Sequence, residues 1–257
     1  MSWLQEVFGV SKPVIGMVHL PALPGAPLYD AEKGMEGILE WARRDLRALQ
    51  AGGIDAVMFC NESDRPYTLR ADPATVAAMA AVVGRLRDEI QVPFGIDILW
   101  DPFAALAVAH ATGARFVREV FTGVYASDMG FWSPSAGEVL RYRRAIGAEG
   151  VRLLFNINAE FAAPMGSRPL AEVARSVAFS SLPDAICVSG PMTSVNPTSP
   201  SSPSRNPRAS SGLHNNSHGL YRFSTTTSTP RGWAARAISI TDRAAAARWR
   251  SRNRSSA

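Results

Sequence analysis

Cysteine, uninterrupted apolar runs and, toward the C-terminus, acidic residues are all scarce in this sequence of 257 residues. Two cysteines, Cys60 and Cys187, are too few for a disulfide framework, and they form no CxxC metal motif. No stretch approaches the roughly 18–20 apolar residues of a transmembrane helix, and the N-terminus lacks the basic-then-apolar pattern of a secretory signal. These absences predict a reduced, cytoplasmic protein without a transmembrane segment.

Charge divides the chain into two parts. Residues 1–193 hold 17 Lys and Arg against 21 Asp and Glu, whereas residues 194–257 hold 10 Arg and one acid, Asp242. The net charge of +5 is therefore the sum of −4 in the first part and +9 in the second. Because the basic charge lies almost wholly in the second part, we expect no specific nucleic-acid surface on the first. We treat 1–193 as a folded domain and 194–257 as a separate basic tail.

Apolar runs alternate with helical patterns through the first part. The runs are continuous, as in parallel strands that are buried on both faces. Asp72-Pro73 and Asp101-Pro102 each supply an N-cap and a first-turn proline, and Ser135 and Glu138 have capping-box spacing. The expected strands are 13–19, 55–60, 93–99, 115–120, 151–158 and 184–189.

This alternation predicts an α/β fold with a parallel sheet, namely a TIM-barrel-like (β/α)₈ fold of which about six βα units are recognisable. A doubly wound open sheet is the alternative. It is less favoured because no GxGxxG follows the first strand.

The tail interrupts this pattern. It contains 14 Ser, 10 Arg and 5 Pro, and only a weak strand pattern at 237–240, a composition that buries too little apolar surface to fold. It can be a disordered basic tail that touches nucleic acid or anionic lipid at a membrane periphery, an unusual small domain, or an out-of-frame translation. The last is favoured, because the first part uses 15 Arg against 2 Lys, as GC-rich codons would. The HxxxH pair His214 and His218 is then accidental, and no metal site is expected.

Reactive groups of barrel enzymes lie at the carboxyl ends of strands and in the loops that follow. Carboxylates there need a partner to offset their desolvation and are typical general acids and bases. The residues expected to be catalytic are Glu62, Asp97 and His19, and those expected to bind a small-molecule substrate are Arg65, Glu119, Asn156, Asn158 and Ser189.

Structural roles compete with these assignments at several positions. His19 can simply hydrogen-bond loop backbone, and Asp101 fits a helix N-cap better than a catalyst. Arg118 and Glu119 are adjacent in a strand, so at most one of them points into the barrel. Cys60 and Cys187 fit small core residues better than nucleophiles.

Four segments resemble, in order, blocks of the BtpA/SgcQ family: Ile15-Gly16-Met17-Val18-His19-Leu20-Pro21 continuing to Gly25, Asn61-Glu62-Ser63-Asp64-Arg65-Pro66-Tyr67, Phe116-Val117-Arg118-Glu119-Val120-Phe121-Thr122-Gly123, and Asp184-Ala185-Ile186-Cys187-Val188-Ser189-Gly190. The resemblance covers about residues 11–193. It implies a TIM barrel, and the match of the opening block strengthens His19 as a candidate.

The resemblance also implies two functions. One is an enzyme that acts on a small phosphorylated sugar or nucleoside-type metabolite, as a lyase, an isomerase or a glycosidic hydrolase. The alternative is a non-catalytic assembly factor for a membrane complex such as photosystem I. Neither implies a particular cofactor, and either is compatible with a homo-oligomer. The family continues with two further strands and a Gly-Thr-Ser type phosphate turn, which this sequence lacks after Thr193. We therefore expect two open sheet edges and impaired activity.

Overall fold

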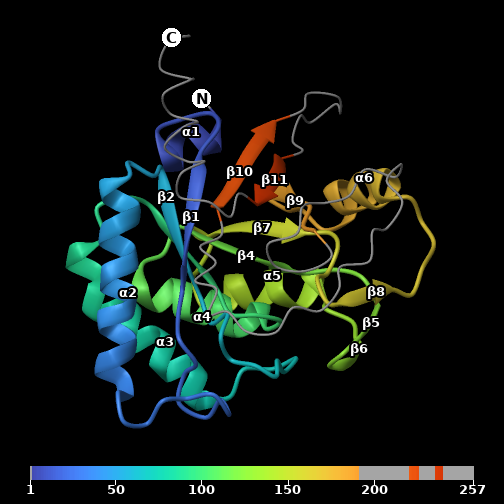
Figure 1. Cartoon of the computed structure of the whole chain (residues 1–257). Helices are drawn as coiled ribbons and strands as arrows, with labels where there is room; N and C mark the ends of the chain where they lie inside the picture. Colours follow the sequence, from blue (N-terminus) through green and yellow to red (C-terminus); the bar gives the residue numbers. More distant parts are fainter. Residues whose placement is uncertain (1, 191–219, 226–234, 240–257) are drawn as a thin grey trace, which may run out of the picture.

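The computed structural model describes residues 2–190, 220–225 and 235–239 of the chain. Within them, strands and helices alternate as β1 (Val14–His19), α2 (Gly34–Ala51), β2 (Ala56–Cys60), α3 (Pro73–Leu86), β3 (Phe94–Asp97), α4 (Pro102–Thr112), β4 (Phe116–Val120), α5 (Ala136–Ala145), β7 (Arg152–Asn156), α6 (Leu170–Ser180) and β9 (Ala185–Cys187). The six strands pair in parallel in the order β1-β2-β3-β4-β7-β9. They form a curled half-barrel (Figure 1), and the predicted barrel-like α/β fold is confirmed.

Local sequence signals explain where the helices begin. Asp72 accepts a hydrogen bond from Thr75 N at 2.8 Å and starts α3, while Asp101 accepts from Phe103 N and Ala104 N at 3.1 Å each and starts α4. Ser135 caps α5 in the same way. These side chains satisfy amide groups that the first helical turn leaves unpaired. Asp101 is thus an N-cap, as the sequence indicated.

Side chains alternate between the two faces of the sheet because successive strand residues point in opposite directions. Val57, Ile96 and Val117 belong to the outer layer, which packs against the helices. Met17, Met58 and Phe116 belong to the inner layer. A short helix absent from the sequence prediction, α1 (Trp3–Phe8), packs its buried face on this inner layer. The amino-terminal end of the half-barrel is therefore filled with apolar side chains.

Two loops that follow strands carry a second, smaller sheet. β5 (Tyr125–Ser127) pairs with β6 (Gly130–Trp132) and with β8 (Ala162–Pro164), all antiparallel. None of these three strands is among those expected from the sequence. Each strand has only three residues, too short a segment for an alternation of apolar and polar residues to be recognised.

Two further strands come from the basic tail: β10 (Leu220–Thr225) and β11 (Ala235–Ser239). β10 pairs antiparallel with β1 and with β11, and the expectation that β1 is an open edge was wrong. The rest of the tail, including His214 and His218, lies outside the described residues. Among the described helices, none is long and apolar enough to cross a membrane.

Candidate active site

Polar residues replace apolar ones where the inner face reaches the carboxyl ends of the strands. Each follows an inner-layer residue of the same strand by two positions, and the two-residue period places it on the same face. These residues are His19, Cys60, Arg118, Asn156 and Ser189, and Asp97 ends the intervening strand β3. The strand ends thus bring together groups that are far apart in the sequence.

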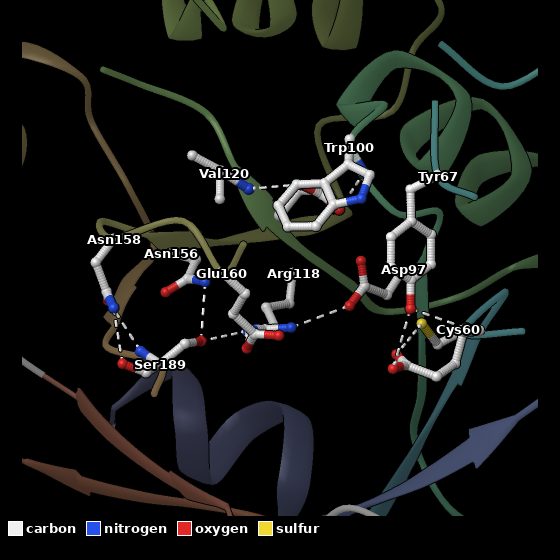
Figure 2. Close-up of polar contacts among 12 residues, drawn as sticks. Cys60, Tyr67, Asp97, Trp100, Arg118, Val120, Asn156, Asn158, Glu160 and Ser189 are labelled. Carbon is white, nitrogen blue, oxygen red and sulfur yellow. Dashed lines mark hydrogen bonds and ion pairs between the residues drawn. The ribbon is translucent and has the colours of Figure 1, made fainter. Parts of the chain in front are cut away.

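Arg118 occupies the centre of this group (Figure 2). Its guanidinium donates to Asp97 Oδ2 at 3.1 Å, to Ser189 Oγ at 2.5 Å and to Glu160 Oε1 at 3.5 Å. The Arg118 and Asp97 side chains are only 7% and 1% exposed. A buried ion pair needs further hydrogen bonds to offset the desolvation of its charges, and Arg118 makes two, to Ser189 and Glu160.

Two asparagines hold Ser189 in place beside Arg118. Asn156 Nδ2 donates to Ser189 Oγ at 2.9 Å. Asn158 uses both sides of its amide, donating to Ser189 O at 2.7 Å and accepting from Ser189 N at 2.9 Å. The loop after β9 is therefore fixed to the loop after β7, and Asn158 positions Ser189.

Asp97 and Glu119 form a buried carboxyl pair. Glu119 accepts from Trp100 N at 3.0 Å and from Val120 N at 2.7 Å. Burial raises the pKa of Glu119 well above its usual range, and the charge of Asp97 raises it further. Burial also raises the pKa of Asp97, although Arg118 opposes that shift. The pair is therefore arranged to retain a proton, with Glu119 as its principal holder and Asp97 ionised against Arg118.

The loop after β2 contributes a second set of polar groups. Asn61 Oδ1 accepts from Leu99 N at 2.8 Å, and Asn61 Nδ2 donates to Asp64 Oδ2 at 3.0 Å. Tyr67 Oη donates to Glu62, with Oε1 at 3.3 Å and the backbone oxygen at 3.0 Å. Burial, followed by the charge of Glu62, raises the pKa of the Tyr67 phenol, so the phenol stays a donor and fixes Glu62.

A cluster of aromatic rings lies next to these polar groups. Trp100 packs edge-on against Trp132 at 5.3 Å between ring centroids and lies 6.1 Å from Tyr67. Phe161 completes the group at 5.8 Å from Tyr67. Trp100 adopts a φ of 71°, a conformation that costs about 1–3 kcal/mol in a non-glycine residue and is concentrated at functional sites.

Two buried polar atoms at the strand ends lack a partner among the described residues. Trp100 Nε1 and Asn156 Oδ1 make no hydrogen bond there. Buried polar groups are nearly always hydrogen-bonded in native proteins, so each exception requires an explanation. One donor and one acceptor without partners can be satisfied by the hydroxyl groups of a small polar ligand.

The structure brings most of the predicted site residues together, in two groups. Asp97, Glu119, Asn156, Asn158 and Ser189 join one network through Arg118 and Ser189. His19 and Glu62 lie together in a second group, with Cys60. Arg65 joins neither by a hydrogen bond or ion pair: it is an exposed residue of the loop after β2.

Five residues of this site are not among the predicted catalytic and binding residues: Cys60, Tyr67, Trp100, Arg118 and Glu160. Three of them, Trp100, Arg118 and Glu160, nevertheless lie in or just after the expected strands. Tyr67 and Trp100 lie in loops, where no periodicity marks them. Cys60 looked like a core residue, and it is indeed 1% exposed. Burial, with the charges of Asp97 and Glu62, raises the pKa of its thiol well above the usual range.

Comparison with known proteins gives a consistent family assignment. Residues 10–201 match the model of the BtpA family. The chain is 52% identical over 190 residues to the sgc region protein SgcQ of Escherichia coli (strain K12), covering 74% of this chain and 71% of that protein. It is 37% identical over 190 residues to the photosystem I biogenesis protein BtpA of Synechocystis, covering 73% of this chain and 65% of that protein.

A solved structure shares a weaker likeness. The 7,8-dihydropteroate synthase of Vibrio fischeri superposes with a TM-score of 0.42 and 13% identity, over 68% of this chain and 60% of that one. The fold assignment rests on the strand topology instead.

Proposed function

The chain belongs to the BtpA family, and from that premise we propose that its strand ends bind a small, hydroxyl-rich metabolite and transfer a proton on it. The substrate class is a phosphorylated sugar or a nucleoside-type compound. The reaction is that of a lyase, an isomerase or a glycosidic hydrolase, each of which needs a general acid or base.

The unpartnered atoms of Trp100 and Asn156 carry this proposal. Hydroxyl groups can donate to one such atom and accept from the other, so a sugar ring suits a donor and an acceptor better than a simple anion does. The aromatic face of Trp100 beside these atoms adds apolar contact for the ring carbons, as is usual in small-molecule sites.

Asp97 is the proposed general acid or base. Its Oδ2 is held by Arg118 at 3.1 Å, and the adjoining Glu119 carboxyl keeps a proton nearby because burial raises its pKa. A carboxylate with a proton-holding neighbour can accept a proton from the substrate and regain its starting state. Glu62, fixed by Tyr67, is the second proposed acid-base group.

The phosphate group of the substrate needs a separate site. The described strand ends carry Asp97, Glu160 and Glu62 against Arg118, an acidic balance that repels an anion even with Glu119 protonated. Arg65, exposed in the loop after β2, is the cation that we assign to a phosphate. Neutral hydroxyl groups then face Asp97, while the phosphate lies toward the loop after β2.

The test is turnover by the full chain on a panel of sugar phosphates and nucleosides, followed by proton and phosphorus NMR. We expect a substrate whose turnover is lost in Asp97→Asn and in Glu62→Gln, and retained in the exposed control Arg85→Met. Wild-type activity in both acid-base variants would overturn the assignment. A chain that turns nothing over but co-purifies with membranes would favour a non-catalytic role of the kind that the name of the Synechocystis relative, a photosystem I biogenesis protein, indicates.

A further inference from the structure

His19, Cys60 and Glu62 lie together although the sequence separates the first two by 41 positions. A nitrogen of His19, the sulfur of Cys60 and a carboxylate oxygen of Glu62 all lie within 4.8 Å of one another. Cys60 Sγ is 3.9 Å from Glu62 Oε2. We propose that these three side chains bind a divalent transition-metal ion of the zinc type, with an open fourth position.

Strand register explains why these residues meet. His19 and Cys60 are direct partners in the parallel pairing of β1 with β2. Both follow inner-layer residues, Met17 and Met58, by two positions, so both side chains point inward. Glu62 comes two residues after Cys60 in the loop. No spacing of these residues in the sequence indicates a metal site, which explains why none was expected.

The three ligand atoms lie close enough together to converge on one tetrahedral ion. Zinc binds nitrogen or oxygen at about 2.0–2.2 Å and sulfur at about 2.3 Å, which places its ligand atoms roughly 3.3–3.7 Å apart. The separations here are at most 4.8 Å, so small side-chain rotations bring the three atoms onto one ion. Thiolate and imidazole ligands select zinc-like ions over Mg²⁺ and Ca²⁺, which prefer oxygen ligands.

The surroundings of the three residues support a bound cation. Tyr67 Oη donates to Glu62 Oε1 at 3.3 Å and orients the carboxylate, as outer partners of metal ligands commonly do. Trp41 Nε1 donates to His19 O at 3.2 Å and fixes the backbone of that ligand. Asp97 is the register partner of Cys60 on β3, so a buried carboxylate stands next to the proposed ion.

Three protein ligands and one open position are the arrangement of catalytic rather than structural zinc. The open position here adjoins Asp97, the proposed acid-base group. An ion at this place would bind a substrate hydroxyl or a water and lower its pKa. Metal binding itself requires no substrate, so it is tested independently of the proposed function.

The experiment is a titration of the metal-free full chain with Zn²⁺ by isothermal calorimetry, and with Co²⁺ by absorption spectroscopy. We expect one Zn²⁺ per chain at this site and a thiolate-to-cobalt charge-transfer band. In the Cys187→Ser control the band must persist. Cys60 is then the only cysteine left, so the band identifies its sulfur as the ligand even if Cys60→Ser fails to fold.

Ligand variants complete the test. Loss of an outer partner costs a metal site about 10–100-fold in affinity, so His19→Asn and Glu62→Gln should each raise the Zn²⁺ Kd at least 100-fold. Tyr67→Phe should raise it about tenfold, and the control His110→Asn, at an exposed position of α4, should leave it unchanged. The double variant His214→Asn/His218→Asn should keep the cobalt band. Absence of that band in Cys187→Ser, or unchanged Zn²⁺ affinity in both His19→Asn and Glu62→Gln, would overturn the proposal.

Discussion

Replacing Arg118 by methionine should cost more stability than any change to an exposed ion pair in this protein. Methionine matches the length of the arginine stem but leaves Asp97, Glu160 and Ser189 without their common donor. Removing one member of a buried ion pair costs about 3–5 kcal/mol, because the partner charge stays buried. The two shorter hydrogen bonds, at about 1.5–3 kcal/mol each for a charged donor, give a similar range.

Urea unfolding followed by far-UV circular dichroism measures this loss as a difference from the wild-type chain. The matched control is Arg85→Met, because Arg85 also makes two hydrogen bonds to a carboxylate, Glu36, but both side chains are at least half exposed. That pair should contribute at most about 1 kcal/mol. The reasoning fails if Arg118→Met destabilises the protein no more than Arg85→Met does.

Three further changes test other parts of the account. Asp97→Asn should reduce the pH dependence of the free energy of unfolding. In the wild type the pKa of Glu119 is raised in the folded state. Its contribution to stability is therefore fully present below about pH 4.5, where Glu119 is protonated in the unfolded chain as well, and is lost as pH rises through the folded-state pKa. Removing the Asp97 charge lowers that pKa, so urea unfolding between pH 5 and 9 should show a smaller loss than in the wild type; an identical slope would refute the coupling. Asp101→Ala should cost about 1–2 kcal/mol through the cap of α4 and leave turnover unchanged. Loss of turnover in a fully folded variant would instead indicate a catalytic role for Asp101. Gly95→Ala should destabilise the sheet by at least 1–3 kcal/mol, because its Cβ would lie 2.2 Å from the Phe116 ring; a thermal midpoint equal to that of the wild type would contradict this.

Most of the half-barrel could be predicted from local signals alone. Parallel strands buried on both faces read as continuous apolar runs, and Asp72 and Asp101, each before a proline, mark helix starts without reference to tertiary structure. The small sheet of β5, β6 and β8 could not be predicted, because three-residue strands carry no period. α1 was missed for a related reason: its six residues are too few for a helical stripe to be distinguished from chance.

The candidate site, like the fold, could be predicted from the sequence only in part. The rule that reactive groups follow parallel strands selected Asp97, Glu119 and Asn156, because it needs only the strand ends. It said nothing of which groups contact each other, since that depends on register. The pairing of His19 with Cys60 is a fact of register, and so is the central place of Arg118 among groups from β3, β7 and β9.

The measurement closest to the central claim is calorimetric binding of the metabolite identified in the NMR panel, with the wild type and Asp97→Asn compared at one pH. The account predicts saturable binding to the wild type at one site, with affinity reduced at least tenfold in Asp97→Asn and unchanged in Arg85→Met. Equal affinity in all three proteins would show that the ligand binds elsewhere and would contradict the assignment of the strand ends as the site.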